Sequence, residues 1–237
     1  MRICHRTHQG LVRASNQDSL LVDEGVMGVA DGMGGHNGGE TASRVAVQVL
    51  KNALRGKKPE PRALEVGMEA ANRRIFDMSR HDSALSGMGT TTTLLWENGT
   101  EVLICHVGDS RAYLLRDGEL KQITEDHSVV AELLRGGVIT PDMARTHPYR
   151  NVITRAVGVD PMVTADIFSH DLKEGDVWMI CSDGLYNMVP DESIAEILRE
   201  AKDDETAAEE LLAFALEAGG TDNITFVIGR ATEVSAV

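Results

Sequence analysis

The chain has 237 residues, of which 42% are hydrophobic and 25% charged, values that are typical of a folded domain and not of a disordered chain. Its net charge of −14 argues against nucleic-acid and anionic-membrane partners, because both are bound by basic surfaces. It has no apolar run of about 18 residues and no apolar leader, so we expect a cytoplasmic protein without a membrane segment.

The first half of the chain is predicted to form strands interrupted by one pair of helices. Three strands come first, at 2–8, 18–23 and 26–30. Apolar residues at helical spacing then predict two helices, between 42 and 50 and between 64 and 78. Four further strands follow through short turns, at 91–96, 102–107, 112–115 and 120–123. The Asp117-Gly118 pair before the last of them predicts a tight hairpin.

The second half begins with a short helix at 128–135 and an irregular stretch that runs to about residue 158. Two strands are predicted next, at 163–168 and 177–181. Apolar residues at helical spacing between 191 and 215 then predict two amphipathic helices with acidic outer faces. A last strand is predicted at 224–229.

This order of elements predicts a single α+β domain over residues 1–237, because no repeat or Pro/Gly/Ser-rich linker divides the chain. Strands joined by short turns are typical of antiparallel sheets. The nearly continuous apolar runs at 102–107 and 224–228 require cover on both faces of a sheet. We therefore expect a four-layer α-β-β-α sandwich, with two antiparallel sheets flanked by helix pairs.

Four aspartates, Asp31, Asp109, Asp183 and Asp222, share a setting, because each lies where an apolar strand meets glycine. Strands hold the backbone rigid and glycine permits close approach, so such positions can aim several carboxylates at one point. Carboxylates that converge repel one another unless a cation neutralises them. Ligation by carboxylate oxygen alone favours Mg²⁺ or Mn²⁺ over zinc or copper.

Ordinary turn chemistry is the alternative explanation for each aspartate, since Asp and Gly are common turn residues and Asp117-Gly118 needs no other role. Turn chemistry is a less favoured explanation for all four aspartates together. The Gly-rich loop at 31–40 precedes a predicted helix, but it contains neither G-K-[ST] nor G-x-G-x-x-G. Nucleotide binding is therefore poorly supported.

Six segments, in this order, resemble the motifs of the metal-dependent PPM-type (type 2C) serine/threonine protein phosphatases in their compact bacterial form: 12–19, 29–36, 88–91, 107–111, 181–185 and 220–224. The resemblance covers about residues 7–230. One departure is Gln17, where the family commonly has Glu, whereas Asp18 is retained. The resemblance implies the same sandwich of two sheets between helix pairs.

The implied activity is hydrolysis of phosphoserine and phosphothreonine esters on proteins by water that two Mg²⁺ or Mn²⁺ ions activate. By resemblance, Asp31 bridges the two ions and the Gly32 carbonyl helps to hold one of them. Asp183 and Asp222 complete the other side. Asp109, together with Asp183, matches a third metal site of the bacterial members.

Other residues receive supporting roles from the same resemblance. Asp18 and Asn223 are expected to orient metal-bound water. The Arg13 guanidinium is expected to bind the phosphate oxygens, because its geometry suits bidentate contacts. His36 is the candidate general acid that protonates the leaving alkoxide, with a solvated or helix-capping histidine as the alternative.

The irregular stretch at 136–157 is long for a connection without regular structure in a compact domain, and such stretches are often functional. It falls where the family has a variable flap. We expect His147, Tyr149 and Arg150 to contact the substrate protein.

The expected partners are phosphorylated proteins and a serine/threonine kinase that phosphorylates them. We expect the protein to act as a monomer. Two alternatives stay open: a phosphatase dedicated to one anti-sigma-type regulator, and a pseudophosphatase that binds phosphoproteins without turnover. The full set of four aspartates with Arg13 argues against the pseudophosphatase, because a binding module has little use for a complete metal site.

Overall fold

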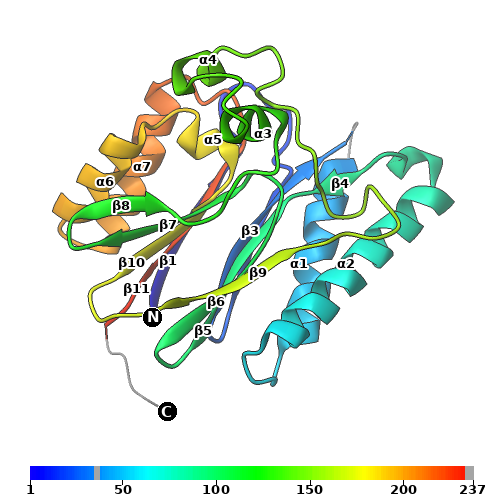
Figure 1. The fold of residues 1–237 in the computed structure, drawn as a ribbon, viewed down its shortest axis with the longest axis horizontal. Helices are drawn as coiled ribbons and strands as arrows, with labels where there is room; N and C mark the ends of the chain where they lie inside the picture. Colours follow the sequence, from blue (N-terminus) through cyan, green and yellow to red (C-terminus); the bar gives the residue numbers. More distant parts are fainter. Residues whose placement is uncertain (35–37, 233–237) are drawn as a thin grey trace.

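The computed structural model describes residues 1–34 and 38–232, and these form four layers (Figure 1). Two antiparallel sheets face each other in the middle. Helices α1 (Gly38–Leu54) and α2 (Pro61–His81) cover one outer face, and α6 (Asp191–Glu200) and α7 (Asp204–Glu217) cover the other. This is the α-β-β-α sandwich that the sequence predicts.

The first sheet has five strands in the order β1-β11-β10-β7-β8, each antiparallel to its neighbours. Its strands are β1 (Arg2–His8), β7 (Arg111–Arg116), β8 (Glu119–Gln122), β10 (Val177–Cys181) and β11 (Ile224–Arg230). Between β7 and β8, Asp117 and Gly118 have φ of 53° and 83°. Two consecutive positive φ values match the tight hairpin turn that the sequence predicts.

The second sheet has the order β2-β3-β5-β6-β9, with a short strand β4 paired to β3. Its strands are β2 (Asp18–Asp23), β3 (Val26–Met33), β4 (Gly89–Thr90), β5 (Thr92–Asn98), β6 (Glu101–Val107) and β9 (Asp166–Asp171). In β6, all residues after Glu101 are buried, as expected for a central strand covered on both faces.

Three hydrophobic clusters separate the layers. The cluster between the two sheets includes Met27, Ile104 and Trp178. A second lies beneath α1 and α2, and a third beneath α6 and α7. Both sheets are therefore buried on both faces, which explains why their central strands are almost uniformly apolar.

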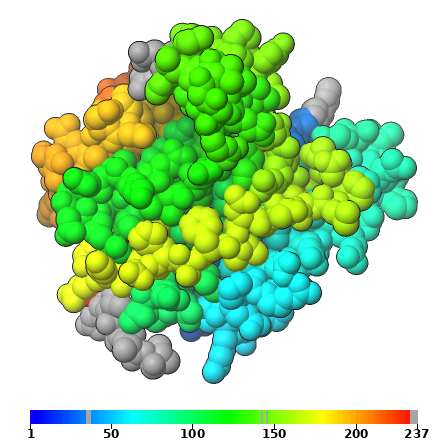
Figure 2. Space-filling view, in the orientation of Figure 1, coloured from blue at the N-terminus to red at the C-terminus, as the bar shows by residue number. Residues whose placement is uncertain are grey.

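Two parts of the fold differ from the predicted elements. A strand was expected at 163–168, but β9 begins at Asp166, because Val163 and Ala165 pack against the cluster under α1 and α2 without pairing to a strand. The stretch before it contains helix α4 (Pro141–Arg145) after α3 (Val129–Arg135), and α5 (Asp183–Tyr186) follows β10. The segment that carries α3 and α4 protrudes from the face shown in Figure 2. No helix in the described residues has the length and apolar character needed to cross a bilayer.

A buried histidine in β6 makes stability depend on pH. The ring nitrogens of His106 lie 2.8 Å from the Thr93 hydroxyl and 3.0 Å from the Glu125 carbonyl oxygen. Burial, and then the neighbouring His127, lowers the pKa of His106 to about 4 from its ordinary 6.5. Between these two values the unfolded chain binds a proton that the folded protein excludes, so stability falls as the pH falls.

We expect the wild type to lose about 3 kcal/mol more of its unfolding free energy than His106→Gln between pH 6.5 and pH 4. Denaturant titrations at each pH measure this difference. The same substitution at the exposed His5 serves as control and should leave the pH dependence as it is in the wild type. Parallel curves for wild type and His106→Gln would contradict the prediction.

Candidate active site

Five aspartates from separate segments come together at one end of the two sheets. Asp31 lies on β3 opposite Asp18 of β2. Asp183 follows β10, Asp222 precedes β11, and Asp109 follows β6. The pKa of Asp31 is raised well above its ordinary value, first by burial and then by repulsion from the other four carboxylates. The structure therefore brings together the four aspartates that the sequence predicts, with Asp18 beside them.

The carboxyl groups of Asp18, Asp109 and Asp183 are also harder to ionise than usual. Burial is the first cause for each, and neighbouring carboxylates add to it. The pKa values of Asp18 and Asp109 rise to about 7, and that of Asp183 rises to about 6. The positive charge of Arg13 partly offsets the rise at Asp183. Ionising all of these carboxyl groups together is therefore unfavourable without a cation.

Two arginines lie near the cluster. Nη2 of Arg13 donates to Oδ2 of Asp222 at 2.5 Å, and this bond raises the pKa of the guanidinium. Arg111 instead makes a bidentate pair with Asp126, at 2.8–3.1 Å, and its guanidinium lies 3.7 Å from the centre of the Tyr186 ring. Arg13 is therefore the arginine that contacts the predicted ligand set, and its side chain stays 54% exposed.

The donor chemistry of the cluster fits a hard divalent cation. Its side-chain donors are carboxylate oxygens, and Oδ1 of Asp18 is buried without any hydrogen-bond partner. Among residues 1–34 and 38–232, no group of three or more His, Cys, Asp or Glu side chains already has the arrangement of a metal site, and Asp222 is paired with Arg13. For Asp222 to bind a cation, its carboxylate would have to release Arg13.

Two glycines allow the segments of the site to approach one another. A Cβ on Gly32 would lie 2.1 Å from the Gly39 carbonyl oxygen and 2.5 Å from that of Gln17. A Cβ on Gly184 would lie 2.0 Å from the carbonyl oxygen of Asn223. Any larger residue at either position would push apart the backbones that carry the aspartates.

Asn223 holds the loop that carries Arg13. Its Nδ2 donates to the carbonyl oxygens of Gln9 and Ser15, both at 2.9 Å, and its Oδ1 accepts from the Gln17 amide at 2.8 Å. The sequence suggested that this amide orients metal-bound water. In the structure its contacts are with the loop backbone, so it fixes the position of residues 9–17.

Ser182 contributes a contact for which the sequence analysis assigned no role. Its hydroxyl donates to Oδ2 of Asp18 at 2.8 Å, which lowers the pKa of that carboxyl against the effect of burial. The signal available in the sequence is its position directly before Asp183, at the end of a buried strand.

A cleft of about 620 Å³ leads away from the aspartates. Asp109, Asp183 and Asp222 line it, and so does Arg150 of the 136–157 segment. His147 and Tyr149 are not among the described residues that line it, although their rings lie 5.7 Å apart in the same segment. His36, the candidate general acid, lies outside the described residues.

Comparison with known families identifies the chain. A family model described as protein phosphatase 2C matches residues 7–216. The chain belongs to the protein phosphatase 2C family. Within this protein phosphatase 2C chain, Gln17 supplies main-chain groups to the site: its amide to Asn223 and its carbonyl to Gly32 and Ser43. Any residue except proline supplies these groups, so these main-chain contacts do not require the usual glutamate.

Other protein phosphatase 2C sequences cover the chain nearly end to end. Serine/threonine protein phosphatase PstP of Mycobacterium tuberculosis is 39% identical over 236 residues, which are 96% of this chain and 44% of that protein. This chain therefore spans less than half of PstP. Serine/threonine phosphatase stp of Listeria monocytogenes is 38% identical over 234 residues, with coverage of 94% and 93%.

Solved protein phosphatase 2C structures share the fold. The crystal structure of the M. tuberculosis phosphatase PstP/Ppp has a TM-score of 0.93 at 38% identity, and the match covers 98% of this chain and 99% of that one. The catalytic domain of PstP in complex with 2 manganese ions has a TM-score of 0.91 at 36% identity, covering 98% of each chain. The predicted sandwich is confirmed.

Proposed function

We propose that this chain hydrolyses phosphoserine and phosphothreonine esters on proteins, with Mg²⁺ or Mn²⁺ as cofactor. The observation that carries the proposal is the convergence of Asp18, Asp31, Asp109, Asp183 and Asp222 at one end of the sheets, where burial, and then repulsion between carboxylates, raises the pKa values of the first four. Asp31, the Gly32 carbonyl, Asp183 and Asp222 would hold two ions, and Asp109 with Asp183 would hold a third. The 2 manganese ions in the related PstP structure support the choice of cofactor.

The bound cations supply activated water and neutralise charge on the phosphate, and the residues of the chain supply the rest. Arg13 is paired with Asp222 and half-exposed, so its planar guanidinium can release Asp222 and bind two phosphate oxygens instead. Asn223 limits the movement of the Arg13 loop through its three backbone contacts. Ser182 donates a hydrogen bond to Asp18, which would orient metal-bound water through its other carboxylate oxygen. His36 is the proposed donor of the proton to the leaving alkoxide.

The 136–157 segment is the proposed flap of a phosphatase core that spans about residues 7–230. Arg150 lines the cleft that leads to the aspartates, which supports a contact with the substrate protein. Tyr149 is 59% exposed on the same segment and, with His147, is proposed to contact substrate outside the cleft. The natural partners would be phosphoproteins and the serine/threonine kinase that phosphorylates them, with the phosphatase acting as a monomer in the cytoplasm.

Hydrolysis of para-nitrophenyl phosphate by the purified protein tests the activity. We expect turnover with Mn²⁺ or Mg²⁺, none with chelator, and release of phosphate from phosphoseryl and phosphothreonyl peptides. A folded protein that binds these peptides without turnover in any metal would support a pseudophosphatase and overturn the proposal. Release from only one regulator in a whole phosphoproteome would indicate a dedicated phosphatase instead of a broad one.

A further inference from the structure

A buried amide on α2 contacts the chain segment that follows the proposed flap. Asn72 is 1% exposed. Its Oδ1 accepts from the Gly158 amide at 2.6 Å, and its Nδ2 donates to the Asp160 carbonyl oxygen at 3.0 Å. A backbone amide can only donate and a carbonyl can only accept, so these two partners fix the orientation of the side chain. Both ends of the amide are therefore bonded to the backbone of residues 158–160.

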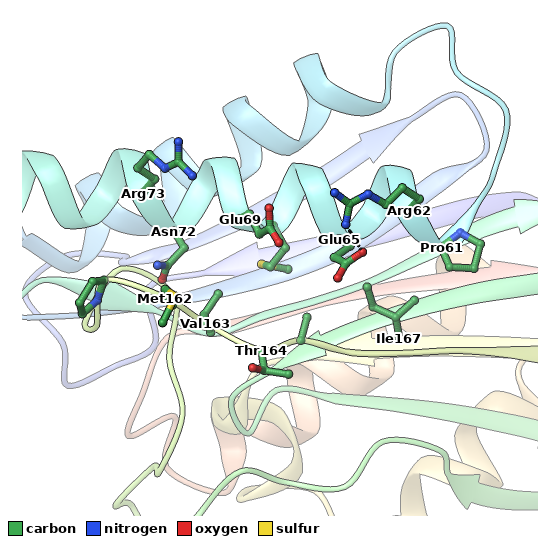
Figure 3. A pocket seen from close by; sticks show the side chains of 13 residues that line it. Pro61, Arg62, Glu65, Glu69, Asn72, Arg73, Met162, Val163, Thr164 and Ile167 are labelled. Atoms are coloured by element: carbon green, nitrogen blue, oxygen red, sulfur yellow. Dashed lines mark hydrogen bonds and ion pairs between the residues drawn. The ribbon is translucent and has the colours of Figure 1, made fainter.

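The same segment lies directly against α2. A Cβ on Gly158 would be 2.1 Å from Cγ2 of Ile75, and Gly158 has φ of +88°, a conformation that glycine adopts without strain. Next to Asn72, a cavity of about 800 Å³ is lined by α2 and by residues 161–167 (Figure 3). Asn72 thus joins the segment to α2 at the edge of this cavity.

From this point a short series of hydrogen bonds reaches Asp31. Val157 exchanges two backbone hydrogen bonds with Thr90, at 2.8 and 3.0 Å. The Thr90 hydroxyl lies 2.8 Å from the carbonyl oxygens of both Asp31 and Thr91 and can donate to either, and the Asp31 carbonyl also accepts from the Thr91 amide at 2.8 Å. Both Val157 and Thr90 are fully buried, so water does not replace these bonds if they break.

We propose that Asn72 is a positioning residue for Asp31: by fixing residues 158–160 on α2, it sets the Val157–Thr90 pair and, through the Thr90 hydroxyl, the backbone of Asp31. This inference rests on the proposed function, in which Asp31 holds the cations. It assigns α2, which contributes no side chain to the carboxylate cluster, a part in holding the metal site in place.

The test measures Mn²⁺ affinity by calorimetry and turnover of para-nitrophenyl phosphate in wild type, Asn72→Ala, Thr90→Val and the double variant. We expect Asn72→Ala to raise the Kd for Mn²⁺ about tenfold and to lower kcat, as loss of a group that supports a metal ligand does. Thr90→Val should have a similar effect. The double variant should be no worse than the poorer single variant, because both changes interrupt one series of contacts.

Met68→Ala is the matched control. Met68 is buried on α2 four residues before Asn72 and lines the same cavity, but no hydrogen bond links it to residues 158–160. We expect this variant to lose thermal stability while its Kd for Mn²⁺ stays within about twofold of the wild type. Amide hydrogen exchange in the metal-free protein should become selectively faster at Thr90 and Val157 in Asn72→Ala, whereas Met68→Ala should speed exchange at buried amides in general without singling out these two.

The proposal is overturned if Asn72→Ala binds Mn²⁺ as the wild type does, if Met68→Ala weakens binding equally, or if the losses of the two single variants multiply in the double variant. Should Asn72→Ala fail to fold, Asn72→Asp takes its place, since it keeps the acceptor for Gly158 and lacks the amide donor to Asp160. A wild type that neither binds Mn²⁺ nor turns over the ester refutes the proposed function itself. An active wild type with an unaffected Asn72 variant refutes only the role of Asn72.

Discussion

We expect Asp31→Asn to abolish metal-dependent ester hydrolysis while making the metal-free protein more stable. The amide has no charge with which to hold a cation, and loss of several kcal/mol of charge stabilisation corresponds to about a thousandfold or more in rate. The same substitution removes one of the five carboxylates that repel one another. Its effects on activity and on metal-free stability should therefore have opposite signs.

Steady-state kinetics with Mn²⁺ and thermal melts with chelator measure these two effects. Asp117→Asn is the matched control, because Asp117 lies in the β7–β8 hairpin with φ of 53°, a conformation that asparagine adopts readily. Asp117→Asn should change neither the rate of hydrolysis with Mn²⁺ nor the melting temperature of the metal-free protein. If Asp31→Asn lowered the melting temperature of the metal-free protein, repulsion within the cluster would not be the dominant electrostatic effect.

Gly184→Ala should have the second largest effect, although it adds only one methyl group. Its Cβ would lie 2.0 Å from the Asn223 carbonyl oxygen and 3.3 Å from Cβ of Asp222. Backbone atoms cannot rotate away as a side chain can, so the segments of Asp183 and Asp222 must move apart. A shift of about 1 Å in a catalytic geometry typically costs about a hundredfold in rate, and we expect kcat/KM to fall by that amount.

The matched control for this change is Gly67→Ala on α2. There the nearest atom to an added Cβ is Cδ2 of Leu50 at 3.3 Å, the flexible end of a side chain. Activity should stay within about twofold of the wild type, and the helix gains from alanine in place of glycine. Wild-type kcat/KM in Gly184→Ala, with Mn²⁺ at saturation, would show that the two segments can separate without harm to the site.

The strands and the aspartates could be predicted because their signals are local. A central strand covered on both faces is apolar at nearly every position, as residues 102–107 are. An aspartate between such a strand and a glycine is found by inspection of a few neighbouring residues, as for Asp31 and Asp183. Local signals failed for α4 and α5, because helices of five and four residues are too short to show a period.

The supporting contacts could not be predicted, because their partners are distant in sequence. Asn72 bonds to a residue 86 positions away, and Ser182 bonds to one 164 positions away. On its own helix, Asn72 is simply a polar residue on a buried face. Only the tertiary fold shows that its two partners are backbone groups of the segment that leads to Thr90.

The carboxylate cluster draws on both sheets of the sandwich. Asp18 and Asp31 belong to one sheet, whereas Asp183 and Asp222 flank strands of the other. The hydrogen bond from Ser182 to Asp18 already spans the two. An ion shared by ligands from both sheets acts as a cross-link, so its binding free energy opposes separation of the layers. In this fold, the concentration of metal would therefore affect how cooperatively the two sheets unfold, in addition to the proposed catalytic rate.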